Sequence, residues 1–400
     1  MSNVRFMENL LDGVDVTWKP LGDVTEIKRG TSITKKNVVE GDVPVIAGGR
    51  TPAYYHNASN REGQTIVIAG SGAYAGFVSW WECPIFVSDA FTVKPMNILL
   101  PRYCYHFLLN MQQQLHDFKS GGGVPHVYPR DVAPILVPIP CPENPKKSLA
   151  IQAEIVRILD AFTAMTAELT AELTAELNLR KKQYNYYRDL LLSFAEGEVE
   201  WKTLGWVGDV RMCKRILKNQ TSDVGDIPFF KIGTFGKAPD AYISRDIFEE
   251  YKERYHYPRV GEVLISASGT IGRAVIFNGE DAYFQDSNIV WIENDESKVL
   301  NKYLFYFYQV ANWNVSDGGV IKRLYNDNIK KTLIPIPFPS DPKRSLAEQA
   351  RIVAILDKFD ALTNSITEGL PREIELRQKQ YEYYRDLLLS FPKPDAEVAA

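Results

Sequence analysis

Apolar residues recur at helical spacing in two long stretches of the chain, residues 148–194 and 345–391. In chain order they are Ile155, Leu159, Phe162, Leu169 and Leu173, then Ile352, Leu356, Phe359, Leu362 and Ile366. This spacing predicts two amphipathic helices. Each stretch follows a proline-rich segment, and we expect Ser148 and Ser345 to be the N-caps. Helices of about 45 residues need partners of similar length, so we expect each to be the other's partner.

The remaining stretches, about 17–140 and 200–340, have a different pattern. Short β-branched and aromatic runs alternate with clusters of Gly, Pro, Asn and Asp, which is typical of strands joined by turns. The runs are TIVIA, FVSWW, IFVSDAFTV, EVLISA, AVIF and NIVWI. Each stretch also contains a predicted helix, around residues 99–115 and 299–311. We therefore predict two separate α+β domains.

The chain is an internal repeat with a separation of 197 residues. The segment RKKQYNYYRDLLLSF at 180–194 recurs at 377–391 with 13 of 15 positions identical, and SLAIQAEIVRILD at 148–160 recurs as SLAEQARIVAILD at 345–357. Looser matches pair Ser71-Gly72 with Ser268-Gly269, Asp89 with Asp286, and Tyr128 with Tyr325. Each half of the chain thus joins a variable domain to a nearly constant helix.

These patterns predict an α+β protein built as domain, helix, domain, helix. The expected parts are a first domain at 1–147, a first helical segment at 148–196, a second domain at 197–344 and a second helical segment at 345–400. The two helices should form an antiparallel, coiled-coil-like spacer between the domains, with approximate two-fold symmetry. That geometry suits a DNA duplex, whose backbone is itself two-fold related.

The formal net charge of −4 counts mildly against nucleic acid as a partner, because neutralisation of phosphates supplies most non-specific DNA affinity. Basic residues are nevertheless clustered in the segment 211–218 and in the pairs Lys322-Arg323 and Lys330-Lys331. Clustering can create a basic face on a protein of low net charge. The alternative for any one cluster is an ordinary solvated surface.

Enzyme motifs are absent or incomplete. Residues 70–75, GSGAYA, match the loose dinucleotide-binding pattern, but they precede a predicted strand instead of the required helix, which favours a turn. The sequence has no G-x-x-x-x-G-K-[ST], G-x-S-x-G, H-E-x-x-H or Asn-Pro-Pro-aromatic motif. Asp89 and Asp286 repeat, but a single repeated acid is more often structural than catalytic. The cysteine and histidine spacings predict neither disulfides nor metal.

Two loops rich in small residues in each half are candidates for contact with DNA. The loop at Ser71, and its counterpart at Ser268, would let backbone amides and short side chains approach phosphates or base edges. The second loop, SGGGVPHVY at 120–128 and SDGGVIKRLY at 316–325, joins a glycine run to basic residues that can follow a sugar-phosphate backbone. A flexible connection before the next strand is the alternative for this second loop.

The repeated helical motifs resemble the conserved regions of Type I restriction-modification specificity subunits. The motifs are SLAIQAEIVRILD, SLAEQARIVAILD, YNYYRDLLLSF, YEYYRDLLLSF and the tandem TAELTAELTAEL at 166–177, which is similar to the IC subfamily. The resemblance covers essentially the whole chain. It implies a non-catalytic subunit with two target-recognition domains, each reading one part of a bipartite DNA site, and helices that set the gap between the parts.

The resemblance also implies partners and cofactors. The expected partners are double-stranded DNA, two modification subunits that methylate adenines with S-adenosylmethionine, and restriction subunits that translocate DNA with ATP and cleave it. We expect no cofactor in this chain, and S-adenosylmethionine, ATP and Mg in the partner subunits. The sequence lacks a signal peptide and an apolar run of about 20 residues, which predicts a cytoplasmic protein without membrane contact.

We expect DNA contacts from basic side chains and from the loops. The candidates are Lys28, Arg29, Lys35, Lys36, Arg50, Ser71, Tyr74, Lys119, His126, Arg130, Arg211, Lys214, Arg215, Lys231, Lys237, Ser268, Thr270, Arg273, Lys322 and Arg323. The candidate spacer residues are Thr166, Leu169, Leu173, Leu177, Leu362 and Ile366.

The TAEL repeats predict that the first helical segment is an adjustable ruler. Each repeat adds about 6 Å of helix, against about 3.4 Å per base pair, so one repeat should move the half-sites by one or two base pairs. Four residues rotate the apolar stripe by only about 40°, which a helix pair can absorb. The second segment carries Gly369-Leu-Pro371 at the equivalent place, where proline should break or kink the helix.

Two other functions compete with DNA recognition. A protein–protein scaffold is supported by the acidic net charge and the abundant tyrosines, and it would lack the steep salt dependence of DNA binding. A hydrolase that uses Asp89 and Asp286 would be active as the purified chain alone.

Overall fold

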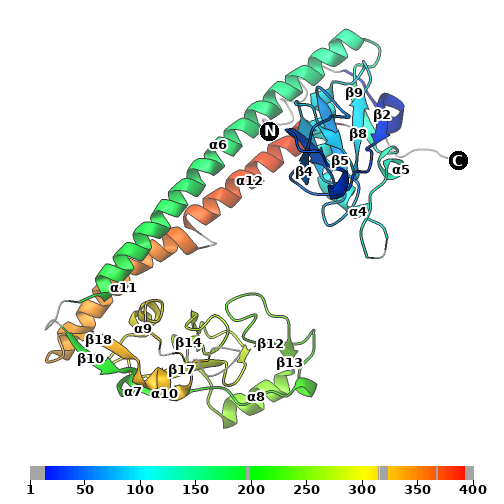
Figure 1. Cartoon of the computed structure of the whole chain (residues 1–400). Coiled ribbons are helices and arrows are strands. Elements are labelled where there is room, and N and C mark those ends of the chain that lie inside the picture. Colours follow the sequence, from blue (N-terminus) through cyan, green and yellow to red (C-terminus); the bar gives the residue numbers. More distant parts are fainter. Residues whose placement is uncertain are drawn as a thin grey trace. The chain divides into compact units, whose positions relative to one another are not determined.

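The chain divides into two compact units (Figure 1). The computed structural model describes residues 14–121, 123–194, 199–313, 315, 323–365 and 368–391. Unit 1 comprises residues 1–172 and 374–400, and unit 2 comprises residues 173–373. Each unit therefore holds one α+β domain together with parts of both helical segments.

The first domain is closed by pairing between its first and last strands. Its elements are β1 (Val16–Pro20), α2 (Leu21–Val24), β2 (Thr25–Arg29), a 3-10 helix (Lys35–Asn37), β3 (Val43–Ile46), β4 (Tyr54–His56), β5 (Thr65–Ala69), β6 (Val78–Trp81), β7 (Phe86–Val87), β8 (Ala90–Pro95), α3 (Pro101–Asn110), α4 (Gln112–Asp117), α5 (Pro129–Val132) and β9 (Leu136–Pro140). Strands β1 and β9 pair antiparallel, with Trp18 opposite Pro138. The chain thus enters and leaves the domain side by side, just before the long helix begins.

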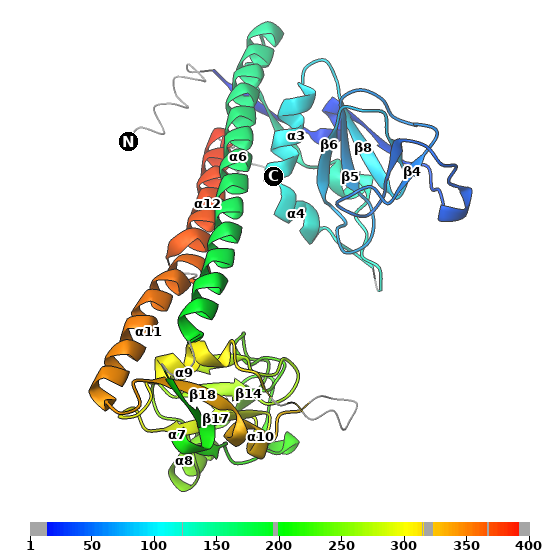
Figure 2. The same ribbon diagram turned by 60° about the vertical axis from the view of Figure 1, so that its left-hand side comes forward.

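Two small sheets form the body of this domain. One is antiparallel with strand order β2-β8-β5-β6, and the other has order β4-β3-β7 with β3 and β7 parallel. Strand β5 is buried throughout, because Ile66 and Ile68 pack in one apolar cluster while Val67 packs in another. A strand covered on both faces is a continuous apolar run rather than an alternating one. Figure 2 shows α3 between the first sheet and the long helix.

The second domain repeats this plan. Its elements are β10 (Val199–Thr203), α7 (Leu204–Val207), β11 (Gly208–Arg211), a 3-10 helix (Lys218–Gln220), β12 (Ile227–Phe230), β13 (Tyr242–Ile243), α8 (Arg245–Arg254), β14 (Val263–Ser266), β15 (Ala274–Ile276), β16 (Tyr283–Phe284), β17 (Ile289–Asn294), α9 (Asn301–Tyr308), α10 (Asn326–Lys331) and β18 (Leu333–Pro337). The sheet orders β11-β17-β14-β15 and β13-β12-β16 match those of the first domain. Its second apolar cluster is larger, because α8 adds Phe248 to an aromatic group around Tyr283.

The helical segments differ in continuity. The first is a single helix of 48 residues, α6 (Pro145–Leu192). The second is divided into α11 (Pro342–Asn364) and α12 (Gly369–Leu388). An interruption at the predicted place is therefore confirmed, but it lies between Asn364 and Gly369, and Pro371 belongs to the first turn of α12 and does not break that helix. Gly369 has φ +80°, and a Cβ on it would lie 2.5 Å from the Ala361 carbonyl oxygen, so only glycine fits there.

The predicted N-caps Ser148 and Ser345 are wrong. Each helix begins three residues earlier, at Pro145 or Pro342. The capping side chains are Asn144, which accepts from Lys147 N at 3.0 Å, and Asp341, which accepts from Arg344 N at 3.0 Å. Proline suits the first helical position because its missing N–H would have had no partner there. The serines are instead buried in the first helical turns.

Within unit 1 the two helical segments pair antiparallel. The rings of Phe162 and Tyr384 stack with centroids 5.5 Å apart, and the hydroxyls of Thr163 and Tyr381 are 3.1 Å apart. A step forward along α6, from Phe162 to Thr163, is thus matched by a step backward along α12, from Tyr384 to Tyr381. The predicted antiparallel pairing is confirmed here.

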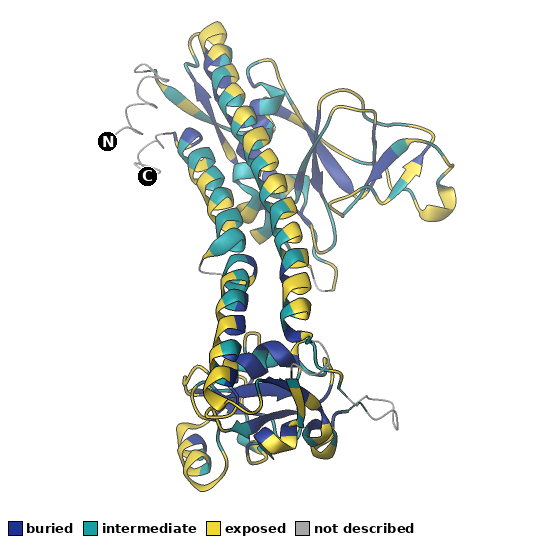
Figure 3. Cartoon of the chain, turned by 90° about the vertical axis from the view of Figure 1, so that its left-hand side faces the viewer, coloured by how far each residue is buried: buried dark blue, intermediate teal, exposed yellow. Residues whose placement is uncertain are grey.

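Unit 2 repeats this contact with the roles of the segments exchanged. Phe359 of α11 stacks on Tyr187 of α6 with ring centroids 5.4 Å apart, at the positions equivalent to Phe162 and Tyr384. The spacer candidates Thr166, Leu169, Leu173, Leu177 and Leu362 are all half-buried, and Ile366 lies outside the described residues. Figure 3 shows such half-buried positions alternating with exposed ones along α6.

Candidate nucleic-acid interface

Each domain is anchored to its helix by a buried glutamine. Gln152 Oε1 accepts from Leu100 N at 2.8 Å, and Gln349 Oε1 accepts from Leu300 N at 2.9 Å. Both glutamines are fully buried, so neither bond can be replaced by water. The orientation of each domain on its own helix is therefore set in the same way.

The two loops predicted from the sequence meet in the first domain. Ser71 and His126 form an isolated β-bridge, Gly72 N donates to Pro125 O at 2.9 Å, and Val127 N donates to Gly70 O at 3.1 Å. Backbone bonds of this kind hold the loop at 70–76 against residues 125–127 of the second loop as one surface. The flexible-connection alternative is thus not needed for the described part of this loop.

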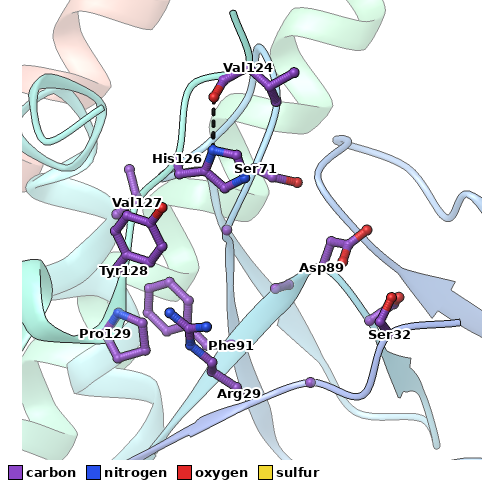
Figure 4. Close-up of a pocket in the computed structure, with 14 residues that line it drawn as sticks. Arg29, Ser32, Ser71, Asp89, Phe91, Val124, His126, Val127, Tyr128 and Pro129 are labelled. Atoms are coloured by element: carbon purple, nitrogen blue, oxygen red, sulfur yellow. Dashed lines mark hydrogen bonds between the residues drawn. The ribbon is translucent and has the colours of Figure 1, made fainter. Parts of the chain in front are cut away.

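A cleft of about 590 Å³ opens where these loops meet (Figure 4). Its lining is Arg29, Gly30, Ser32, Gly70, Ser71, Ser88, Asp89, Ala90, Phe91, Val124, His126, Val127, Tyr128 and Pro129. The His126 ring stacks on Tyr128 with centroids 5.8 Å apart. The guanidinium groups of Arg29 and Arg130 lie over the same Tyr128 ring, 5.4 and 4.8 Å from its centroid. Tyr128 thus organises three groups that can bind phosphate or base edges.

Three further candidates gather at the Ser71 loop. The Arg50 guanidinium lies 4.8 Å from the centroid of Tyr74, and Lys119 Nζ donates to Ala73 O at 2.9 Å. Both Arg50 and Tyr74 are exposed. These side chains extend the cationic surface around the cleft.

Three candidates lie away from this surface. Lys28 is on β2, and Lys35 and Lys36 are on the 3-10 helix that follows it. All three are exposed, and none lines the cleft. Among the described residues, none of the three has a side-chain hydrogen bond, ion pair or ring contact to the two loops.

The second domain assembles its loops in the same way. Ser268 and Arg323 form the equivalent β-bridge, at the positions of Ser71 and His126. Ser268 Oγ donates to Asn288 Oδ1 at 2.8 Å, and Arg323 Nη2 donates to Ser287 O at 3.2 Å. Lys322 lies outside the described residues. The shared backbone plan therefore presents different side chains in the two domains.

Arg273 and Thr270 lie beside this bridge. Arg273 Nη1 donates to Phe235 O at 2.9 Å, which connects the Ser268 loop to the loop that carries Lys231 and Lys237. Thr270 is exposed on the same loop. The structure thus brings together Ser268, Thr270, Arg273 and Arg323.

Acidic neighbours neutralise part of the basic segment 211–218. Arg211 pairs with Glu293 at 2.8 Å, and Arg215 pairs with Asp286 at 2.9 Å. Lys231 is paired as well, with Asp240 at 3.1 Å. Lys214 lies over the ring of Tyr255, and Lys237 is exposed. Neither lysine has a carboxylate partner among the described residues. Of the cations in this segment, Arg211 and Arg215 are thus neutralised by carboxylates, which favours the alternative of an ordinary solvated surface for this part of the cluster.

Sequence reasoning missed the role of Tyr128 as a platform for cations. The signal was present, because Tyr128 recurs as Tyr325 at the repeat spacing. Tyr325 is exposed, and no cation lies over its ring in the part of the chain that the structure describes. The two tyrosines thus occupy equivalent positions in the repeat, but they make different contacts.

The described residues contain neither a metal-binding cluster nor a membrane-spanning helix. Among them, no group of three or more His, Cys, Asp or Glu side chains could hold a metal ion. No described helix combines the length and apolar character needed to cross a lipid bilayer.

Comparison with known proteins gives the same family for both halves of the chain. Residues 14–179 and 196–376 each match the family described as Type I restriction modification DNA specificity domain. A putative type I restriction enzyme specificity subunit of Haemophilus influenzae is 50% identical over 400 residues, which cover 98% of this chain and 99% of that protein. The EcoR124I/EcoR124II specificity subunit of Escherichia coli is 36% identical, with 99% of both chains covered.

A solved structure shares the fold. It was determined for a study of complex assembly and conformational transition of the type I restriction-modification system, and it covers 94% of this chain and 97% of its own. The TM-score is 0.56 at 16% sequence identity, so the likeness concerns the fold alone.

Proposed function

This chain belongs to the family of Type I restriction-modification DNA specificity subunits, and we propose that it reads a bipartite DNA site with one part assigned to each domain. It is the non-catalytic subunit that recognises the DNA sequence. The observation that carries the two-part assignment is the pair of matched loop assemblies, Ser71 with His126 and Ser268 with Arg323. A common backbone with different side chains is what two readers of different sequences require.

Variants in each loop assembly test this assignment. We would co-express the chain with its modification subunits and map methylated adenines by long-read sequencing. His126→Ala should change only one half of the methylated motif, and Arg323→Ala only the other half, because each side chain belongs to one domain. Arg157→Ala on α6, a cation outside both loop assemblies, is the control. Two variants that alter the same half, or neither half, would contradict the proposal.

We further propose that the helical segments dock two modification subunits. Three large apolar residues lie exposed on one face of α6, Leu179, Tyr186 and Leu190, with exposed fractions of 60%, 64% and 51%. The equivalent residues Leu376 and Tyr383 are exposed on α12. The exposed apolar residues of α6 belong to unit 2, and those of α12 belong to unit 1. This distribution supports one docking site per unit.

The docking sites can be tested one at a time. Tyr186→Asp and Tyr383→Asp each place a charge among the exposed apolar residues of one unit, so each should remove one modification subunit. The double variant should remove both. Native mass spectrometry of the co-purified complex measures the stoichiometry. Glu168→Ala, at an exposed polar position of α6, should leave it unchanged. A double variant that retains two modification subunits would locate docking elsewhere.

Cofactors complete the proposal. We assign S-adenosylmethionine to the modification subunits, and ATP and Mg to restriction subunits, with the whole complex acting in the cytoplasm. Calorimetric titration of the purified chain with S-adenosylmethionine should give no binding heat, whereas the complex with modification subunits should bind it. Tight binding by the chain alone would contradict this division.

A further inference from the structure

Asp89 places a carboxylate in the cleft of the first domain, and no basic side chain among the described residues forms an ion pair with it. It lines the cleft together with Arg29, Ser71 and His126, and its side chain is exposed (Figure 4). Within the described residues, its carboxylate makes no salt bridge and no side-chain hydrogen bond. A free acceptor thus lies inside a surface that is otherwise suited to phosphate.

The position of Asp89 is fixed by its backbone neighbours. Gly70 N donates to Asp89 O at 3.0 Å, and Ser88 N donates to Ile46 O at 2.8 Å. Gly30 packs so closely that a Cβ on it would lie 2.3 Å from Ser88 O. The backbone that carries the carboxylate is therefore a rigid link between β7 and β8, so only rotation of the side chain is left to be ordered on binding.

The equivalent aspartate of the second domain is used differently. Asp286 pairs with Arg215 at 2.9 Å and accepts from Ser287 Oγ at 3.3 Å. Its side chain is only 15% exposed. Its charge is neutralised inside the protein, whereas the charge of Asp89 is available to a ligand.

A free carboxylate beside DNA is favourable only at particular bases. It repels phosphates and can only accept hydrogen bonds, so it needs a base that donates in the major groove. Cytosine N4 and adenine N6 are the donors there, while guanine and thymine present acceptors. Adenine also presents N7, an acceptor that a carboxylate cannot satisfy. Cytosine has no competing acceptor on its own major-groove edge.

We propose that Asp89 is a specificity-determining residue that selects a cytosine in the half-site read by the first domain. The inference rests on the proposed function, since it presumes that this cleft faces a base edge. Arg29 and Arg130, held over Tyr128, then balance the phosphates near the carboxylate. The carboxylate contributes selectivity, and the cations contribute affinity.

The test is selection from a DNA library by the complex of the full chain with its modification subunits. The library randomises the first half-site and keeps the second constant. Wild type should prefer cytosine at one position at least 10-fold, as expected of a good base contact. Asp89→Ala should abolish that preference. Asp89→Asn should shift it to adenine, because an amide can accept from N6 and donate to N7. Asp286→Asn is the matched control and should leave the first half-site unchanged.

The outcomes separate this inference from the proposed function. Unchanged base preferences in both Asp89 variants would overturn the inference and leave bipartite recognition intact. Equal loss of affinity for every sequence in both variants would also overturn it, because the residue would then be structural. If Asp89→Ala fails to fold, the nearly isosteric Asp89→Asn decides alone. A wild-type complex without any sequence preference would overturn the proposed function, and the inference with it.

Discussion

His106 and Tyr306 occupy equivalent places beside a helix aspartate in the two domains. His106 Nε2 lies 2.7 Å from Asp160 Oδ1, and Tyr306 donates its hydroxyl to Asp357 Oδ1 at 2.6 Å. Burial lowers the pKa of His106, and this effect outweighs the hydrogen bond to Asp160, which raises the pKa. The buried ring is thus neutral over a range of pH in which an unfolded chain would protonate it.

The lowered pKa predicts that unit 1 is less stable in acid. As pH falls below the ordinary histidine pKa of about 6.5, the unfolded chain gains a proton that the folded chain does not, so the free energy of unfolding falls. His106→Tyr, which copies Tyr306 and keeps a donor to Asp160, should reduce this loss. Urea titrations at pH 7.5 and 5.5 measure the fall in the free energy of unfolding. An equal loss in variant and wild type would show that other groups dominate the acid response.

Arg130 should contribute affinity without sequence selectivity. Its side chain is 80% exposed and lies over Tyr128, so it can reach a phosphate. Arg130→Ala should weaken binding of the complex to all DNA sequences alike and lower the slope of log affinity against log salt by about one. Arg157→Ala, which removes a cation from α6, is the control. A change in preferred sequence would instead make Arg130 a base-reading residue.

At the scale of elements, the continuity of α6 decides how the helical segments can change length. The helix runs without interruption through the TAEL repeats, while the partner segment stops at Asn364 and restarts at Gly369. Each turn of α6 along the repeats has one of these half-buried residues: Thr166, Leu169, Leu173 and Leu177. A change of one repeat in α6 turns this apolar stripe by only about 40°, which keeps it nearly aligned with the partner segment.

Deletion of Thr174–Leu177 should therefore shorten the DNA spacer by one or two base pairs and leave both half-sites unchanged. The reason is the loss of about 6 Å of helix at constant domain structure. Mapping of methylated adenines measures the spacer directly. Thr174→Ala, at an exposed position of the same repeat, should keep the wild-type spacer. An unchanged spacer in the deletion would remove α6 from the role of ruler.

At the scale of the whole molecule, each unit is built from one domain and parts of both helical segments. The equivalent contacts Phe162–Tyr384 and Phe359–Tyr187 exchange the roles of the two segments. The glutamine anchors Gln152 and Gln349 follow the same exchange. An exchange of this kind is what a two-fold relation produces, and it keeps approximate two-fold symmetry as our expectation for the complete chain.

That expectation can be tested by duplicating one domain. A chain that carries residues 16–140 in both domain positions, with α6, α11 and α12 unchanged, should direct methylation to an inverted repeat. Two identical readers related by a two-fold axis read the same sequence on opposite strands. A chain with residues 199–337 in both positions is the matched control and should give a second, different inverted repeat. Direct repeats would show a translational arrangement instead.

The sequence alone determined the architecture, because its signals are local or repeated. The helical periodicity at 148–194 and 345–391, the TIVIA-type strands and the break near Gly369 all depend on neighbours within a few residues, and the match at 197 residues showed that one plan occurs twice. The motifs of the repeat also indicated the family.

Only the tertiary structure decided which of the candidate residues meet. Arg29, Ser71 and Tyr128 are far apart in the chain, and backbone pairing between loops brings them to one cleft. Distant contacts also distinguish the two repeated aspartates. Asp89 has no ion pair among the described residues, whereas Asp286 is neutralised by Arg215. Asp89 and Asp286 are separated by the repeat spacing of 197 residues, so they look equivalent in the sequence. No local pattern distinguishes the two aspartates. The difference arises from the charges that each fold places within a few ångströms.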